Sequence, residues 1–127
     1  MQLKLDPLDK NPFKFNLNDF HHDENRLLEK SGLFTFFNKI EGPDGIFKAD
    51  VHFGDGLIHE DKTFFSSAWS REKVAQVIFE ASQNRIADVT DPLQQYYKKY
   101  LCKKDNLIIE IIFNKENIIT SAYPILT

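Results

Sequence analysis

The sequence predicts a single α+β domain, with helices packed against antiparallel sheets and a helix-rich N-terminal part. A length of 127 residues suits one domain with its own hydrophobic core. The shares of hydrophobic residues (42%) and charged residues (28%) are typical of a globular protein. Short strand-like runs and one clear amphipathic helix follow one another in the order β-β-α-α-β-β, which favours helices on an antiparallel sheet.

The first third of the chain gives the weakest pattern. Residues 1–20 show no clear periodicity and are interpreted as irregular structure or a short helix with apolar anchors. A helix is expected over residues 23–30, ended by Ser31-Gly32, because glycine suits the left-handed conformation after a helix. Strands are expected over residues 33–38, 46–53 and 57–65, the last two joined by a tight turn at Gly54-Asp55-Gly56.

The strongest helix pattern begins after Ser70, a good N-cap, and extends over residues 71–85 with Ile86 continuing its apolar face. Thr90-Asp91-Pro92 predicts a second, shorter helix to about Leu101, because proline is favoured at the first helical position. Two β-branched runs, 107–113 and 118–125, predict a closing hairpin around a four-residue loop.

Composition restricts the class of function. Twelve phenylalanines are best explained as core, since each buries much area. The net charge of −3 argues against nucleic-acid binding by bulk electrostatics, so an RNA ligand would need a local basic patch. The densest candidate contains Lys98 and Lys99 and continues to Lys104, although a solvated helix face explains these lysines more simply. The single cysteine, Cys102, excludes an intramolecular disulfide, and no apolar run approaches a membrane span.

The segment from Lys62 to Ser70 combines a lysine, hydroxyl groups and aromatic rings directly before the strongest helix. A cation close to a helix N-terminus is a common way to hold a phosphate group. Ser121 and Tyr123 lie two apart in the last predicted strand and therefore share a face, where a hydroxyl and a ring could bind a nucleobase or form part of the core.

His21 and His22 are candidates for proton transfer, because histidine titrates near neutral pH. Adjacent side chains point in different directions, so one of the two is expected to face a site. A metal site built from these histidines, His52, His59 and the neighbouring carboxylates is the less favoured alternative, because their spacing matches no zinc or calcium motif.

These features together resemble the bacterial branch of the EndoU ribonuclease family, whose nuclease domains lie at the C-termini of contact-dependent inhibition toxins and other polymorphic toxins. The resemblance covers residues 42–124, and its motifs occur in the family's order. They are Gly42-Pro43-Asp44-Gly45-Ile46-Phe47-Lys48-Ala49-Asp50-Val51, Thr63-Phe64-Phe65 with Trp69-Ser70, Glu80-Ala81 with Asn84-Arg85, and Ser121-Ala122-Tyr123-Pro124. Residues 1–41 are then a variable N-terminal part of the same 1–127 domain, carrying the histidine motif Phe20-His21-His22-Asp23.

The resemblance implies a metal-independent endoribonuclease that needs no cofactor and leaves a 2′,3′-cyclic phosphate. It implies His21 and His22 as proton-transfer groups and Lys62 as the catalytic lysine. It implies substrate binding by Ser121 and Tyr123, and the sequence adds Ser66, Lys98 and Lys99 as further candidates for substrate binding. The implied partners are RNA, with tRNA favoured, and a cognate immunity protein, in a monomer or a 1:1 complex. Export within a larger toxin and action in the cytoplasm of a target cell are also expected.

One departure from the family leaves alternatives open. The family's first histidine should precede His21, and residues 1–20 contain no histidine. Either His22 supplies the second proton-transfer group, or His52 or His59 enters the site, or activity is reduced. The second hypothesis is therefore a catalytically degenerate EndoU-like module that binds RNA or protein, and the third is an acidic immunity or adaptor protein.

Overall fold

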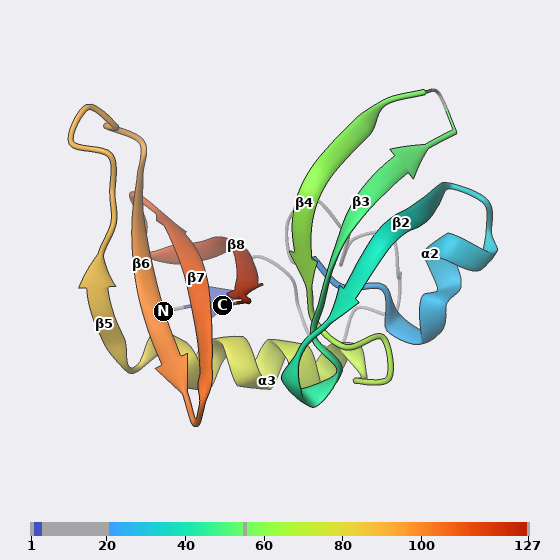
Figure 1. Ribbon diagram of the computed structural model, residues 1–127. Helices are drawn as coiled ribbons and strands as arrows, with labels where there is room; N and C mark the ends of the chain where they lie inside the picture. Colours follow the sequence, from blue (N-terminus) through green and yellow to red (C-terminus); the bar gives the residue numbers. More distant parts are fainter. Residues whose placement is uncertain (1, 4–20, 55, 127) are drawn as a thin grey trace.

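Two sheets stand side by side in the computed structural model, which describes residues 2–3, 21–54 and 56–126 (Figure 1). The larger sheet has five strands in the order β1-β8-β7-β6-β5, and the smaller has three in the order β2-β3-β4. All neighbouring strands are antiparallel except β1, which pairs with β8 in parallel. The predicted α+β class with antiparallel sheets is therefore confirmed.

The elements follow one another with short connections. The strands are β1 (Gln2–Leu3), β2 (Phe34–Glu41), β3 (Phe47–Phe53), β4 (Ile58–Phe64), β5 (Arg85–Asp88), β6 (Tyr97–Lys104), β7 (Leu107–Asn114) and β8 (Ile118–Ile125). The helices are the short η1 (Glu24–Arg26), α2 (Leu27–Lys30) and η2 (Pro43–Gly45), and the longer α3 (Arg71–Ser82).

Helix α3 covers one face of the five-stranded sheet (Figure 1). Ser70 caps this helix as predicted, its Oγ accepting the Lys73 N–H at 3.0 Å. The alternating burial of β7 sends Ile109 and Ile111 into the core with Ile78 of α3, and all three are fully buried. The opposite face of the same strands is consequently available to build a site.

The three-stranded sheet has a separate, phenylalanine-rich core. Its buried side chains are Phe34, Phe47, Ala49, Val51 and Phe64, with Phe36 and Phe53 packed beside them. The rings of Phe47 and Phe64 stack at 5.1 Å, on opposite partners of the β3–β4 ladder. This packing confirms the interpretation of these phenylalanines as core.

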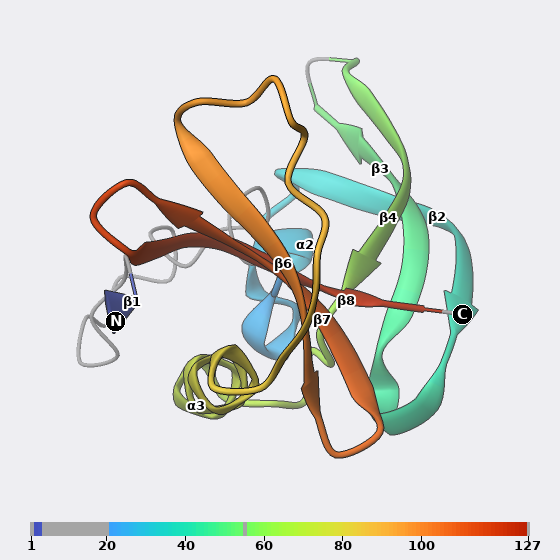
Figure 2. The same cartoon turned by 90° about the vertical axis from the view of Figure 1, so that its left-hand side faces the viewer.

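The two sheets meet where β4 approaches β8 (Figure 2). The hydroxyl of Thr63 in β4 donates a hydrogen bond to the carbonyl oxygen of Pro124 in β8. This bond connects residues 61 positions apart in the chain and fixes the junction between the two sheets.

Two predicted helical segments are wrong. Asp91 begins a turn instead of a helix, with its Oδ1 accepting the Leu93 N–H at 2.9 Å, and the lysine-rich residues that follow form strand β6. An aspartate before proline gives the same local signal in an Asx turn and at a helix start. The residues after it form a strand because eight of them pair with β7. Helix α3 also ends at Ser82, so that Ile86 lies in β5 and is about half exposed.

The helix-rich N-terminal part is not supported either. Among the described residues that precede β2, Gln2–Leu3 form a strand and only η1 and α2 are helical. The segment expected to be irregular or a short helix lies outside the described residues, apart from β1. The strands predicted over 46–53, 57–65, 107–113 and 118–125 are confirmed with shifts of one residue at most.

Candidate active site

The end of β4 and the segment that leads from it to α3 hold the histidine pair. The Thr63 carbonyl binds the His21 ring, and the Phe65 N–H donates to the His21 carbonyl at 2.9 Å. Farther along, the Trp69 carbonyl binds the ring of His22. The segment that the sequence marked as a phosphate holder therefore packs against the histidine motif.

His21 lies at the junction of the two sheets. Its Nδ1 is 2.7 Å from the Thr63 carbonyl oxygen, and its ring stacks on Tyr123 at 4.9 Å with an interplanar angle of 22°. A carbonyl oxygen can only accept a hydrogen bond, so Nδ1 carries the proton and the lone pair of the neutral ring is on Nε2. Its backbone is left-handed, with φ of 48°. The geometry thus selects the tautomer in which Nε2 is the basic nitrogen.

His22 occupies a different environment. Its side chain is 1% exposed, and Nε2 donates to the Trp69 carbonyl at 3.0 Å. Both the burial and the hydrogen bond to the chain before α3 give His22 a structural role in this conformation. His21 is also buried, at 9% exposure, but it is the histidine whose ring stacks on Tyr123. The two rings of the pair therefore point to different surroundings, as the alternation of adjacent side chains suggested.

Lys62 precedes the residue that binds the His21 ring. It lies opposite Ala49 in the β3–β4 ladder and shares a face of β4 with Phe64, whose ring is 5.6 Å from that of His21. In the described part of the chain, no carboxylate forms an ion pair with Lys62. The lysine therefore keeps its charge available on the His21 side of the junction.

The two remaining histidines differ in their position relative to Lys62. His52 lies on the other face of β3, because it alternates with the buried Val51, and its ring contacts Phe37 at 4.2 Å. His59 is opposite Val51 and its ring lies 5.4 Å from that of Phe53. Of these two histidines, His59 is the one on the face that carries Lys62.

Strand β8 and its neighbours extend the site away from His21. Ser121 and Tyr123 lie opposite Ile112 and Glu110 on the face that α3 does not cover. Glu110 is a residue on this face that the sequence did not predict as part of the site. The pattern that could have indicated it is a single carboxylate within an otherwise apolar strand. Burial raises the pKa of Glu110 above its ordinary value, while Lys99 at 3.8 Å acts in the opposite direction.

Adjacent lysines of β6 separate onto the two faces of the sheet. Lys99 lies opposite Ile112 and shares the face of Ser121, whereas Lys98 lies opposite Phe113 and points to the face of α3. Both lysines were expected at the substrate because they belong to the densest basic patch of the sequence. The structure brings only Lys99 to the Tyr123 face.

Ser66 serves the turn that follows β4. Its side chain is buried, and its Oγ accepts the Ala68 N–H at 3.2 Å. The backbone of Gly45 packs so closely that a Cβ there would lie 2.6 Å from Ser66 Oγ. These contacts give Ser66 a role in fixing the turn.

Within the described part of the chain, no three histidine, cysteine or carboxylate side chains gather closely enough to hold a metal ion. The thiol of Cys102 is fully buried, and burial raises its pKa. No helix of the described residues is both long and apolar enough to cross a membrane.

A histidine stacked on a tyrosine, with a lysine in β4 and the Ser121 hydroxyl group in β8, is an arrangement whose side chains are suited to acid–base chemistry on a phosphodiester. A family model described as "Bacterial EndoU nuclease" matches residues 20–126. The chain therefore belongs to the bacterial EndoU nuclease family, a family of endoribonucleases. The match begins at Phe20 and so includes the histidine motif. No curated protein and no solved structure matches the chain.

Proposed function

We propose that the domain cleaves RNA by attack of a ribose 2′-oxygen on the adjacent phosphorus, without a metal ion. The observation that carries this proposal is the contact of His21 with both Thr63 and Tyr123 where the two sheets meet. It puts a ring with a basic Nε2 beside an aromatic side chain that can stack on a base or sugar.

In the proposed reaction, His21 takes the proton from the 2′-hydroxyl group or delivers one to the departing 5′-oxygen, and His59 or a water molecule makes the other proton transfer. The new bond joins the 2′-oxygen to phosphorus, and the bond from phosphorus to the 5′-oxygen breaks. The products are a 2′,3′-cyclic phosphate and a 5′-hydroxyl group. Lys62 stabilises the negative charge that builds on the phosphoryl oxygens in the transition state.

Substrate binding is assigned to the face of β8 that α3 leaves uncovered. Tyr123 stacks on the base or sugar, Ser121 offers a hydroxyl group, and Lys99 attracts the phosphate backbone. Support comes from the shared face of these side chains in the strand registers. tRNA is the favoured substrate class, by resemblance to the toxin domains of the family.

The biological role follows the same resemblance. We infer that the domain acts as the toxic C-terminal part of a larger exported protein, enters the cytoplasm of a competing bacterium and is neutralised by an immunity protein. The family membership supports this role. Growth arrest on expression of the domain alone, relieved by a gene that lies beside it, tests this inference. Unimpaired growth with folded protein present would contradict it.

Lys62→Gln tests the site with a matched control. It should lower the cleavage rate by about 10²–10³-fold, the usual effect of losing one transition-state donor. Lys39→Gln removes an equal charge from the same sheet, at a lysine 3.9 Å from Glu41, and should leave the rate nearly unchanged. Equal rates for the two folded variants would contradict the assignment of Lys62.

A second candidate function is binding without cleavage. It is favoured by the burial of His22, whose side chain is 1% exposed, and by the absence of histidine from residues 1–20. Cleavage rates of His52→Asn and His59→Asn, compared with that of the wild-type protein, distinguish the two candidates, because a loss of cleavage in one variant identifies a second proton-transfer histidine. A wild-type protein that binds RNA in a salt-sensitive way and releases no product would establish the binding module.

A further inference from the structure

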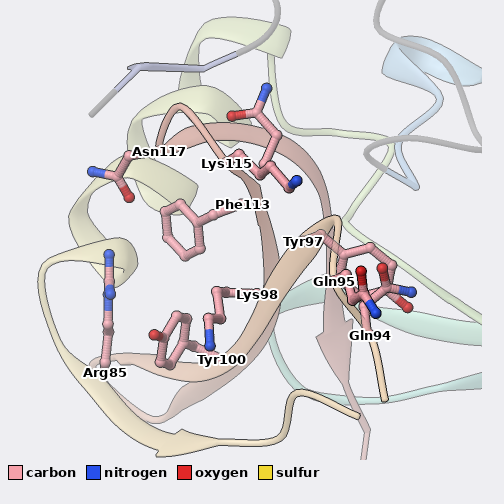
Figure 3. Close-up of a pocket in the computed structure, with 10 residues that line it drawn as sticks. Arg85, Gln94, Gln95, Tyr97, Lys98, Tyr100, Phe113, Lys115 and Asn117 are labelled. Atoms are coloured by element: carbon pink, nitrogen blue, oxygen red, sulfur yellow. The ribbon is translucent and has the colours of Figure 1, made fainter. Parts of the chain in front are cut away.

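A pocket of about 410 Å³ lies on the five-stranded sheet, away from the His21 site (Figure 3). Arg85 of β5, Tyr100 of β6 and Phe113 of β7 form one part of its wall, and the loop before β6 and the β7–β8 turn supply the rest. Pockets of this volume hold small organic ligands or single nucleotides.

The part of the pocket formed by Tyr100 and Phe113 lies on the face of the sheet opposite the candidate active site, whereas Tyr97 at the edge of the pocket alternates onto the other face. In the β6–β7 ladder, Lys98 is opposite Phe113 and Tyr100 is opposite Ile111, both of which face α3. Tyr123 is on the other face. A ligand in the pocket therefore leaves the surface around Tyr123 unoccupied.

Stacking groups form the centre of the pocket. The guanidinium carbon of Arg85 lies 4.4 Å from the ring centre of Tyr100 and 4.6 Å from that of Phe113. Figure 3 shows the three side chains grouped together on one side. Phe113 is buried, whereas Arg85 is exposed and keeps its planar group at the surface. Guanidinium planes and aromatic rings are the surfaces on which unpaired nucleobases stack.

The charge of the pocket is positive in a chain whose net charge is −3. Arg85, Lys98 and Lys115 line it, and none of the described residues that line it is a carboxylate. Within the described residues none of the three cations forms an ion pair. Asp88 is the acidic group that interacts with Lys98, but its pKa is lowered mainly by hydrogen bonds from Thr90. The pocket is thus suited to an anionic ligand.

Side-chain amides complete the lining and have a fixed orientation. The Oε1 of Gln94 accepts the Tyr96 N–H at 2.7 Å, and the Oδ1 of Asn114 accepts the Glu116 N–H at 2.9 Å. Because the oxygens are used by the backbone, the amide nitrogens are the groups left to donate to a ligand. Donors of this kind bind base oxygens or phosphate oxygens.

We propose that this pocket is a second RNA-binding site, which takes one unpaired nucleotide of the substrate at a distance from the bond that is cut. Its base stacks on the layer formed by Arg85 and the two rings, and its phosphate lies near Lys98 and Lys115. This inference rests on the proposed function in that the ligand is the substrate RNA. The site adds affinity for long substrates and is not needed for a dinucleotide, which occupies only the region around His21.

The test measures binding of a single-stranded 2′-O-methyl RNA, which lacks the attacking hydroxyl group and cannot be cut. Fluorescence anisotropy should show about 10-fold weaker binding to Arg85→Gln, with a smaller loss in Arg85→Lys, which keeps the charge. Lys39→Gln is the matched control, because Lys39 Nζ also lies 4.4 Å from a ring centre, that of Phe47, on the other sheet. Wild-type protein should bind an abasic chain of equal length more weakly than the RNA.

Unchanged affinity in Arg85→Gln would overturn the proposal and leave the pocket to a protein partner. Equal losses in Arg85→Gln and Lys39→Gln, or equal affinity for the abasic chain, would overturn it in favour of bulk electrostatics. On cleavable RNA, Arg85→Gln should raise KM for a long substrate and leave a dinucleotide unaffected. Wild-type protein that binds methylated RNA through Arg85 but cuts no RNA would refute the proposed nuclease reaction alone.

Discussion

Substitution of the two adjacent histidines can separate effects on cleavage from effects on stability, because an amide side chain can replace one nitrogen of each ring. In His21→Asn, the amide nitrogen takes the place of Nδ1 and keeps a donor for the Thr63 carbonyl, but no titratable nitrogen remains. In His22→Gln, the amide nitrogen takes the place of Nε2 and keeps the hydrogen bond to Trp69.

The magnitudes follow from these contacts. His21→Asn should slow cleavage by about 10²–10⁴-fold, the usual contribution of a proton-transfer group. It loses the stack on Tyr123 at 4.9 Å, worth about 0.5–1.5 kcal/mol, so its Tm should fall by only about 2–6 °C. His22→Ala vacates a site that is 1% exposed and removes the donor to Trp69. That loss should cost about 2–4 kcal/mol, or about 8–15 °C in Tm, and His22→Gln should recover most of it.

Thermal unfolding and cleavage of a fluorescent RNA, at a temperature where every variant is folded, measure the two effects independently. We expect His21→Asn to be stable and inactive, and His22→Gln to be folded and active. The reasoning is refuted if folded His22→Gln loses as much activity as His21→Asn, or if His21→Asn cuts as fast as the wild-type protein.

Two further changes test the packing around the site. Gly45→Ala should lower the free energy of unfolding by about 2–4 kcal/mol, because φ is 77° and the new Cβ would meet Ser66. Gly32→Ala, at φ of 84° with no atom within 4 Å, should lower it by only about 1–2 kcal/mol. Equal losses in chemical denaturation would show that the Ser66 contact is unimportant. Glu110 has a raised pKa in the folded state, so its favourable contribution is present at low pH and is lost as the pH rises above about 4.3. Glu110→Gln should therefore melt at or above the wild-type Tm at pH 7 and lose this advantage in acid, and a lower Tm at pH 7 would indicate that the pair with Lys99 dominates.

Local signals predicted the elements whose cause is local. Ser70 and the apolar face after it predicted the start of α3, and the four-residue loop before Ile118 predicted the β7–β8 hairpin. The helix predicted after Asp91 is wrong because these residues form a strand that is stabilised by pairing with β7, while the local aspartate and proline only form a turn. The predicted end of α3 is wrong because the Asn84 carbonyl accepts the Lys103 N–H, which joins the chain to β6 instead of continuing the helix.

The site was only partly predictable for the same physical reason. His21 and Tyr123 are far apart in the chain, and their stacking depends on how the two sheets meet. Nothing local distinguishes His21 from His22, since tertiary contacts decide which ring stacks on Tyr123 and which binds the Trp69 carbonyl. The assignment of Lys98 rested on the density of lysines in the sequence, which does not show that Lys98 and Lys99 point to opposite faces of strand β6.

The most direct test of the central claim is the chemistry of the RNA ends. Purified protein is incubated with total tRNA in EDTA, and the products are analysed for their terminal groups. A metal-independent site at His21 and Lys62 predicts fragments with a 2′,3′-cyclic phosphate on one side and a 5′-hydroxyl group on the other. Fragments with 5′-phosphate ends, or no cleavage by folded protein with or without divalent metal ions, would contradict the claim.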